Sequence, residues 1–142
     1  HSMICGVLAT DISKTSLKKT ELGVYRCSKI TSDIRSRLES YVEFKNNETF
    51  RFHEILRNEL TVRKFNLNTK TYPFKKKFHI IFCRNVLLYF NKEQREITQK
   101  KLILSLKEGG FIFLGDAENL DFALLNLKKI GNGIYQKKVE FK

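Results

Sequence analysis

Polar residues able to bind a ligand follow directly after short apolar stretches at three places in the chain. Asp11 ends one such stretch, Asn66-Leu67 end a second, and Arg84-Asn85 end a third. In open α/β sheets the ligand crevice lies outside the carboxyl ends of the strands. These residues are therefore candidates for ligand contact, and the alternative for Arg84 is a side chain that only leaves the core for solvent.

The chemistry of these side chains favours a nucleoside or a carboxylate as ligand. A carboxylate at a strand tip offers two acceptor oxygens, which suit the two hydroxyl groups of a ribose. Asp11 stands in such a position, although it is equally suited to cap the helix predicted just after it. The planar fork of the Arg84 guanidinium matches a carboxylate.

Several common catalytic patterns do not occur in the sequence. It contains no G-x-G-x-x-G or G-x-x-x-x-G-K-[ST] for phosphate binding, and no G-x-S-x-G nucleophile turn. The three cysteines have no Cys-x-x-Cys spacing, so we expect reduced core thiols, no disulfide and no metal site.

The length is about that of one domain, and 42% of the 142 residues are hydrophobic, which is enough to build a core. We expect the chain to fold as one unit or as part of one. No apolar run reaches the roughly 18 residues of a membrane span, so we expect a cytoplasmic protein without a transmembrane segment. His1-Ser2-Met3 indicates an expression scar followed by a start methionine. The formal charge of +12 favours an anionic partner, although lysines scattered over a solvated surface are the simpler interpretation.

The first half of the sequence predicts a strand, a helix and a small antiparallel insertion. The helix runs over 14–22, between an N-cap at Ser13 and a stop at Gly23. A polar helical stretch follows from Tyr25 to Glu39. Alternation on either side of residues 45–48 then predicts a β-hairpin, and residues 60–65 predict a further strand.

The second half predicts alternating strands and helices. Residues 80–83 have the composition of a strand buried on both faces of a parallel sheet. A helix over 92–105 follows, with Asn91 as N-cap, apolar positions 97, 102, 103 and 106 on one side, and 107–110 as its end. A strand over 111–114 and a terminal hairpin over 127–139 complete an α/β fold with a mostly parallel sheet.

The order of several motifs resembles the CheR family of chemotaxis receptor methyltransferases from Val7 onward. The most specific is Cys83-Arg84-Asn85-Val86, with Tyr89-Phe90 after it. The others come in the family's order: Ala9-Thr10-Asp11-Ile12-Ser13, Gly23-Val24-Tyr25, Tyr41-Val42-Glu43-Phe44, Asn66-Leu67, Leu106-Lys107-Glu108-Gly109-Gly110 and Gly115-x-x-Glu118-Asn119-Leu120.

The resemblance implies a Rossmann-like methyltransferase sheet that uses S-adenosylmethionine and releases S-adenosylhomocysteine. It also implies an antiparallel β-subdomain, here residues 41–54, and a C-terminal β-hairpin. The activity implied is protein-glutamate O-methylation, the formation of carboxyl methyl esters on the cytoplasmic domain of methyl-accepting chemoreceptors. The alternative is a non-catalytic basic module that docks on acidic receptor helices or nucleic acid.

The resemblance also assigns roles to single residues. The family's ribose-binding acidic residue falls on Asp11, its adenine-side pair on Asn66 and Leu67, and its further cofactor pair on Arg84 and Asn85. An aromatic position close to the transferred methyl group falls on Tyr89. Arg84 and Tyr89 are thus the expected catalytic residues.

The sequence departs from the family pattern in two respects. The loop after Leu114 reads Gly115-Asp116-Ala117-Glu118, where the family usually has Gly-His-Ser-Glu. The helical N-terminal domain and the first strand with its cofactor loop have no counterpart. We therefore expect residues 4–142 to form an incomplete methyltransferase domain that is inactive alone. Such a domain either pairs its own strands directly across the gap, or two copies form a homodimer or a strand-exchanged dimer.

Overall fold

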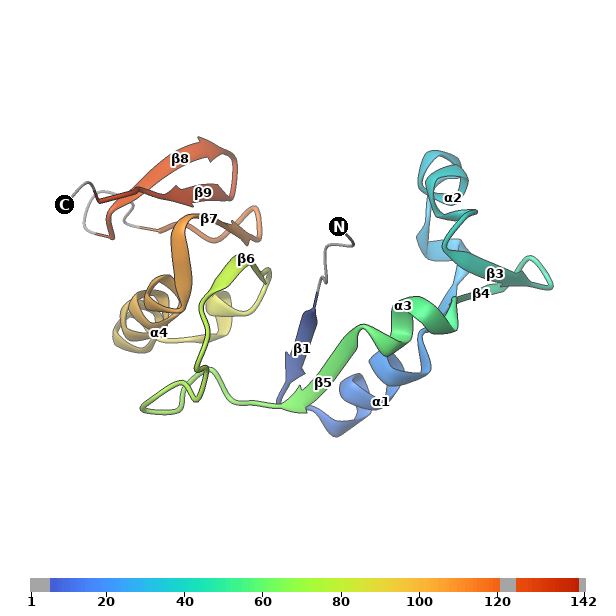
Figure 1. Cartoon of the computed structure of the whole chain (residues 1–142), viewed down its shortest axis with the longest axis horizontal. Coiled ribbons are helices and arrows are strands. Elements are labelled where there is room, and N and C mark those ends of the chain that lie inside the picture. Colours follow the sequence, from blue (N-terminus) through green and yellow to red (C-terminus); the bar gives the residue numbers. More distant parts are fainter. Residues whose placement is uncertain (1–5, 121–124, 141–142) are drawn as a thin grey trace. The chain divides into compact units, whose positions relative to one another are not determined.

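The chain divides into two compact units, residues 1–66 and 67–142. This computed structural model describes residues 6–120 and 125–140 (Figure 1). The described strands form three sheets, with the orders β1-β5, β2-β4-β3 and β6-β7-β9-β8. Because the structure combines helices with parallel and antiparallel strands, the α/β prediction is confirmed at this coarse level. The expectation of a mostly parallel sheet is wrong for the described strands, because two of their pairings are parallel and four are antiparallel.

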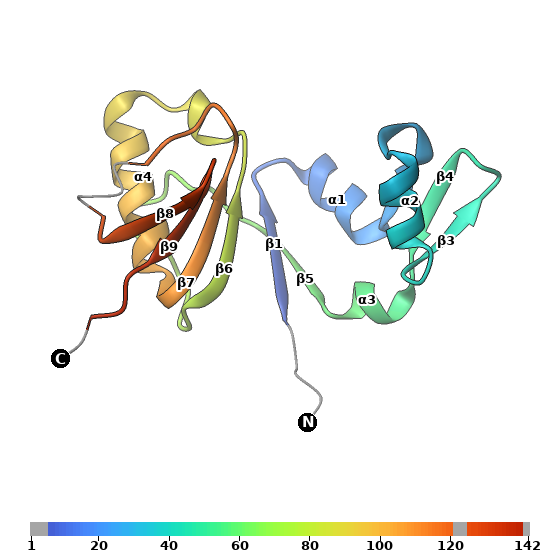
Figure 2. The ribbon, with the colours of Figure 1, turned by 90° about the horizontal axis from the view of Figure 1, so that it is seen from above.

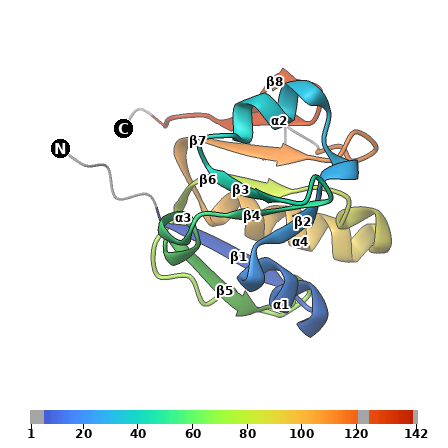
Figure 3. The same cartoon turned by 90° about the vertical axis from the view of Figure 1, so that its right-hand side faces the viewer.

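The first unit contains a parallel pair of strands and a helix that packs on them. β1 (Val7–Asp11) pairs in parallel with β5 (Leu60–Lys64), and Asp11 lies opposite Lys64. α1 (Lys14–Leu22) contacts both strands (Figure 3). The predicted helix is confirmed: the Ser16 N–H donates to the Ser13 hydroxyl at 3.3 Å, and Gly23 ends the helix with φ 63°.

An antiparallel sheet of three strands completes the first unit. It contains β2 (Val24–Arg26), β4 (Thr49–Phe52) and β3 (Val42–Lys45), and α3 (Glu54–Asn58) leads from it to β5. The predicted hairpin is confirmed as β3 and β4. Its turn contains Asn46 and Asn47, whose positive φ angles of 50° and 54° asparagine tolerates better than most residues.

The helical prediction for residues 25–39 was wrong at its start. Tyr25 lies in β2 and is followed by the 3₁₀ turn η1 (Cys27–Lys29), and the helix α2 covers only Ser32–Leu38. Tyr25 stacks on Phe50 of β4 with ring centroids 5.8 Å apart. Aromatic packing across strands therefore overrides the local helical pattern.

The second unit is a mixed sheet with one helix on its face (Figure 2). β6 (Phe78–Cys83) is parallel to β7 (Leu106–Leu114), and β9 (Ile134–Lys137) lies antiparallel between β7 and β8 (Leu127–Gly131). α4 (Lys92–Leu104) begins at Asn91 with a capping box. Its Leu102 and Ile103 enter the core with Leu87, Leu106, Ile112, Leu114 and Tyr135. The predicted helix and terminal hairpin are confirmed.

Three details of the second unit differ from the sequence prediction. β6 is not buried on both faces, because Ile80 and Phe82 are 52% and 71% exposed while Cys83 is buried. Since α4 covers one face of this sheet, only alternate side chains of β6 enter the core. Residues 107–110 belong to β7, where the register shifts opposite Phe78–Ile80. Ile97, predicted on the apolar side of α4, is 47% exposed.

The structure describes two of the three cysteines, and membrane-spanning helices can be sought only among the described residues. Cys83 is a buried free thiol and Cys27 a partly exposed one, whereas Cys5 lies outside the described residues. Within residues 6–120 and 125–140, no helix has the length and apolar character needed to cross a membrane.

Candidate functional site

Asp11 lies at the carboxyl end of β1, where its side chain is partly buried. Its Oδ1 accepts the backbone N–H of Ser13 at 2.8 Å, which supports the turn into α1. Asp11 thus supports the turn before the helix, but it does not cap the helix as the alternative prediction had it, because the N-cap residue is Ser13. A ligand contact through its other oxygen remains compatible with this bond.

Asn66 and Leu67 follow β5 at the boundary between the two units. Asn66 is exposed, and the partly buried Leu67 packs against the core of the second unit. The Leu67 carbonyl accepts hydrogen bonds from the Tyr72 hydroxyl at 2.9 Å and from Lys101 Nζ at 3.2 Å. Lys101 also donates to the Thr69 carbonyl at 2.6 Å, so α4 fixes the segment that begins at Leu67.

Arg84 is the first residue after β6 and reaches the loop that follows β7. Its Nη2 lies 3.5 Å from Asp116 Oδ1, and the two side chains are 53% and 80% exposed. A long, exposed ion pair of this kind contributes little to stability. The guanidinium is thus available to a carboxylate ligand, which would compete with Asp116.

Asn85 and the two residues after it donate their backbone N–H groups to a single carboxylate, that of Glu118. Glu118 Oε2 accepts from Asn85 at 2.7 Å and from Gly115 at 2.8 Å. Glu118 Oε1 accepts from Val86 at 2.8 Å and from Leu87 at 2.6 Å. The ends of β6 and β7 are therefore tied together at the point where the ligand was predicted.

The charge of Glu118 is stabilised by backbone dipoles. Burial alone would raise the pKa of this carboxyl, but the four N–H donors outweigh burial and hold it below its ordinary value. The neighbouring Cys83 has its thiol pKa raised to about 12, first by burial and then by the Glu118 charge. Cys83 is therefore a protonated core thiol and not a nucleophile.

Tyr89 ends the short 3₁₀ turn η2 (Leu87–Tyr89) and is 80% exposed. Arg84, Asn85 and Tyr89 thus all belong to the segment that follows β6 in the second unit. Asp11 and Asn66 belong to the first unit, and Leu67 to the second. A role for each of these residues in binding or catalysis stays a prediction.

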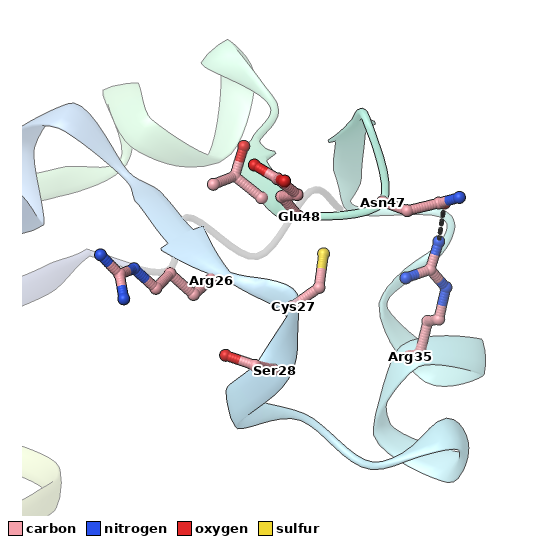
Figure 4. A pocket seen from close by; sticks show the side chains of 7 residues that line it. Arg26, Cys27, Ser28, Arg35, Asn47 and Glu48 are labelled. Carbon is pink, nitrogen blue, oxygen red and sulfur yellow. Dashed lines mark hydrogen bonds between the residues drawn. The ribbon is translucent and has the colours of Figure 1, made fainter.

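Each of the two units has a hollow among its described residues. The larger, of about 720 Å³, is lined in the antiparallel sheet region by Arg26, Cys27, Arg35 and residues 47–49 (Figure 4). It contains none of the predicted site residues. The smaller, of about 250 Å³, includes Arg84, Asp116 and the stacked pair Phe82 and Phe113. The smaller hollow is the better candidate for a ligand site, because it combines a cation with the carboxyl ends of two parallel strands.

Metal binding has no candidate ligand set among residues 6–120 and 125–140. No group of three or more His, Cys, Asp or Glu side chains gathers there in a way that could hold an ion.

The family model described as "CheR methyltransferase, SAM binding domain" matches residues 1–133. The chain belongs to the CheR methyltransferase family. The resemblance drawn from the Cys83–Val86 motif is thereby confirmed, and membership implies the α/β fold of methyltransferases that bind S-adenosylmethionine.

Curated relatives in this family carry the name chemotaxis protein methyltransferase. That of Borreliella burgdorferi is 32% identical over 131 residues, which cover 92% of this chain and 46% of the relative. Chemotaxis protein methyltransferase Cher2 of Pseudomonas putida is 34% identical, covering 81% and 42%. The Salmonella typhimurium protein is 30% identical, covering 91% and 46%. The chain therefore spans less than half the length of these CheR relatives.

Sequence reasoning missed two side chains that organise the CheR segments described above. Glu118 was noted only as part of a family motif, although a polar loop after a buried strand, with a glycine three residues before the acid, could have drawn attention to it. Lys101 gave no sequence signal, because its partners are backbone carbonyls far away in the chain.

Proposed function

We propose that this chain is the cofactor-binding part of a CheR methyltransferase that esterifies glutamate side chains of chemoreceptors. The observation that carries the proposal is the match of residues 1–133 to the SAM binding domain of this family. The names of the relatives support chemotaxis as the setting. The comparisons give no support to the alternative of a non-catalytic basic module.

The side-chain types predicted at the strand ends suit separate parts of the cofactor that the family implies. S-adenosylmethionine combines a ribose, an adenine and a methionine carboxylate, and when bound it supplies an electrophilic sulfonium methyl group. We assign the ribose to Asp11, the adenine side to Asn66 and Leu67, and further cofactor contacts to Arg84 and Asn85. A carboxylate, amides and a guanidinium are the groups that such a ligand requires.

The reaction places few chemical demands on this chain. A glutamate side chain with a pKa near 4.3 is already ionised at neutral pH, so no general base is needed. The bound cofactor would supply the methyl group to one oxygen of that carboxylate, with loss of the carbon–sulfur bond, so that a neutral ester and a neutral thioether would result. Holding the acceptor carboxylate in the right orientation toward the methyl group lowers the activation free energy by roughly 7 to 11 kcal/mol in favourable cases. We assign Arg84 to a carboxylate, of the acceptor or of the cofactor, and Tyr89 to the surroundings of the methyl group.

The receptor contact is assigned to the antiparallel sheet β2-β4-β3. Its outer strand edges can accept an extended peptide by β-strand addition. Arg26 and Arg35 line the hollow beside it, and Arg35 donates to Asn47 Oδ1 at 3.4 Å (Figure 4). These cations suit an acidic receptor segment, as does the formal charge of +12.

The domain arrangement and location belong to the same proposal. Residues 4–142 form the incomplete methyltransferase domain, with residues 41–54 within its β-subdomain. It acts in the cytoplasm, where receptor glutamates are presented, and in this length it associates as a homodimer or a strand-exchanged dimer.

Three titrations test the proposed function. The chain is titrated with S-adenosylhomocysteine, with a cytoplasmic receptor fragment and with nonspecific DNA, at two salt concentrations. We expect the receptor fragment to bind, and we expect its affinity to fall at higher salt, because the attraction is largely electrostatic. Binding to DNA with no response to receptor fragment or S-adenosylhomocysteine would contradict the proposal.

A further inference from the structure

Two segments far apart in the sequence direct their backbone N–H groups at one point. Asn85, Val86 and Leu87 follow β6, and Gly115 follows β7, about 30 residues later. Their N–H groups lie 2.6 to 2.8 Å from the oxygens of Glu118. Each oxygen accepts two of these bonds, so the four donors form a cradle that is complementary to one carboxylate in shape and in charge.

The Glu118 side chain that fills this cradle is itself only 5% exposed. A charge this deeply buried is costly unless hydrogen bonds compensate for it. The reverse also holds, because four N–H groups left without an acceptor at this place would each lose a hydrogen bond. The turn after β6 and the carboxylate therefore depend on one another.

The local backbone has a conformation that fits a tight turn. Asn85 has a φ of 58°, in the left-handed region that asparagine tolerates better than most residues. A Cβ atom on Gly115 would collide with Asn85 Oδ1 and would lie 2.7 Å from Glu118 Oε2. Gly115 is therefore needed for the two loops to approach this closely.

We propose that Glu118 is a positioning residue, whose carboxylate fills a backbone N–H cradle and so holds Arg84 and Asn85 in the orientation that meets the ligand. It touches no substrate in this assignment. The structural part stands on the geometry alone, and only the link to the ligand rests on the proposed function.

The cradle distinguishes a carboxylate from its close analogues. In Glu118→Gln one acceptor oxygen remains, and the amide NH₂ faces two N–H donors, so at least two bonds are lost. In Glu118→Ala the whole acceptor is lost and a space shaped like acetate remains, because acetate matches the deleted atoms. Acetate should therefore enter the cradle of the alanine variant and restore the turn.

The experiment follows the backbone amides of Asn85, Val86, Leu87 and Gly115 by NMR in the 142-residue chain. We expect these four signals to shift together or broaden in both Glu118 variants. In Glu118→Ala, sodium acetate should return them toward the wild-type positions, and sodium chloride at equal ionic strength should not. The control is Glu96→Ala, since Glu96 is an exposed carboxylate on α4.

A thermal melt covers the case in which Glu118→Ala is too unstable for NMR. Acetate should then raise its Tm, while leaving the Tm of wild type and of Glu96→Ala unchanged relative to chloride. Unchanged amide signals in both variants, or an equal response to acetate and chloride, would overturn the proposal.

The link to the ligand has its own measurement. S-adenosylhomocysteine is titrated at millimolar concentrations into wild type and Glu118→Ala, with and without acetate, and followed at the same amides. If the turn is ordered a tenth of the time in the variant, its affinity falls about tenfold, and acetate restores it. No response in wild type would count against the proposed function alone, because the acetate result still decides the role of Glu118. Equal affinity in the two proteins would overturn the positioning role.

Discussion

Asp11 has a structural role and a proposed binding role that depend on different atoms of its carboxylate. Oδ1 accepts the Ser13 N–H at 2.8 Å and so supports the start of α1. The ribose contact would use the second oxygen and the negative charge. An asparagine keeps an acceptor at Oδ1 but replaces the second oxygen by an NH₂ donor. The two roles can therefore be separated by one substitution.

The first prediction compares Asp11→Asn with Asp11→Ala. Asp11→Asn should leave the Tm nearly unchanged, whereas Asp11→Ala should lower it, because only alanine removes the bond to Ser13. Both substitutions should weaken the binding of S-adenosylhomocysteine by about 10- to 150-fold, since a hydrogen bond to a charged acceptor contributes about 1.5 to 3 kcal/mol. Calorimetry in a form of the protein that binds this ligand is the measurement. An affinity unchanged in Asp11→Asn would remove Asp11 from the ribose site.

A second prediction concerns acid and Glu118. Its pKa in the folded protein is below the ordinary 4.5, so in the window between the two values the unfolded chain binds more protons. The stabilisation from Glu118 is therefore complete above pH 4.5 and is lost as the pH falls through the folded-state pKa. Urea unfolding between pH 6 and pH 3 should show a flatter pH dependence in Glu118→Gln than in wild type.

The matched control for this titration is Glu96→Gln, which removes an exposed carboxylate. Its pH dependence should follow wild type, because an exposed group has no comparable set of backbone donors. A Glu118→Gln curve as steep as that of wild type would mean that other carboxyl groups account for the acid sensitivity.

The sequence predicted that a strand ends just before Arg84 and Asn85, because an apolar strand followed by polar residues is a local pattern. It did not predict the acceptor of the backbone N–H groups that begin at Asn85. Glu118 lies 31 to 33 residues away, and its partners are backbone N–H groups, which every residue but proline carries. Side-chain identity at those partner positions therefore gives no hint of the contact.

At the scale of elements, local rules predicted those boundaries that local interactions determine. Ser13 and Gly23 define α1, and Asn91 defines the start of α4, because caps act within one helical turn. The boundaries that failed depend on distant partners. β2 exists because Tyr25 packs on Phe50, and the early start of β7 at Leu106 depends on pairing with Phe78 of β6.

The third prediction concerns the contact between α4 and the segment after Leu67. Lys101 donates to the carbonyls of Leu67 and Thr69 and lies 5.0 Å from the centre of the Tyr72 ring. Lys101→Met keeps the aliphatic part of the side chain but removes both hydrogen bonds. It should reduce the unfolding free energy by about 1 to 3 kcal/mol and speed amide exchange near Thr69.

The adjacent Lys100 provides the control for this substitution, because it is exposed on the same helix. Lys100→Met has the same change in charge and volume and should stay within about 0.5 kcal/mol of wild type. Equal effects of the two substitutions would mean that Lys101 affects stability only through its charge, and that its hydrogen bonds to the segment after Leu67 do not stabilise the protein.

At the scale of the whole molecule, the family membership and the strand pairing together bear on activity. Among the described strands, β1 pairs with β5, and β6 pairs with β7 in a different sheet. The resemblance places a further strand, with the loop for the methionine half of the cofactor, between the equivalents of β1 and β6. The match covers 46% of the Borreliella burgdorferi relative.

The last prediction is that the 142-residue chain alone neither methylates receptor nor binds S-adenosylhomocysteine with micromolar affinity. Asp11 and Asn66 would retain their ribose and adenine contacts, but the methionine tail would have at most Arg84, in the alternative in which its guanidinium holds the cofactor carboxylate. Among the described strands, β1 and β6 lie at sheet edges, and a second copy could pair with such an edge through association or strand exchange. Sedimentation should therefore show a concentration-dependent dimer, and calorimetry a dissociation constant weaker than micromolar. Methyl transfer by the isolated chain, or tight binding by a strict monomer, would contradict this expectation.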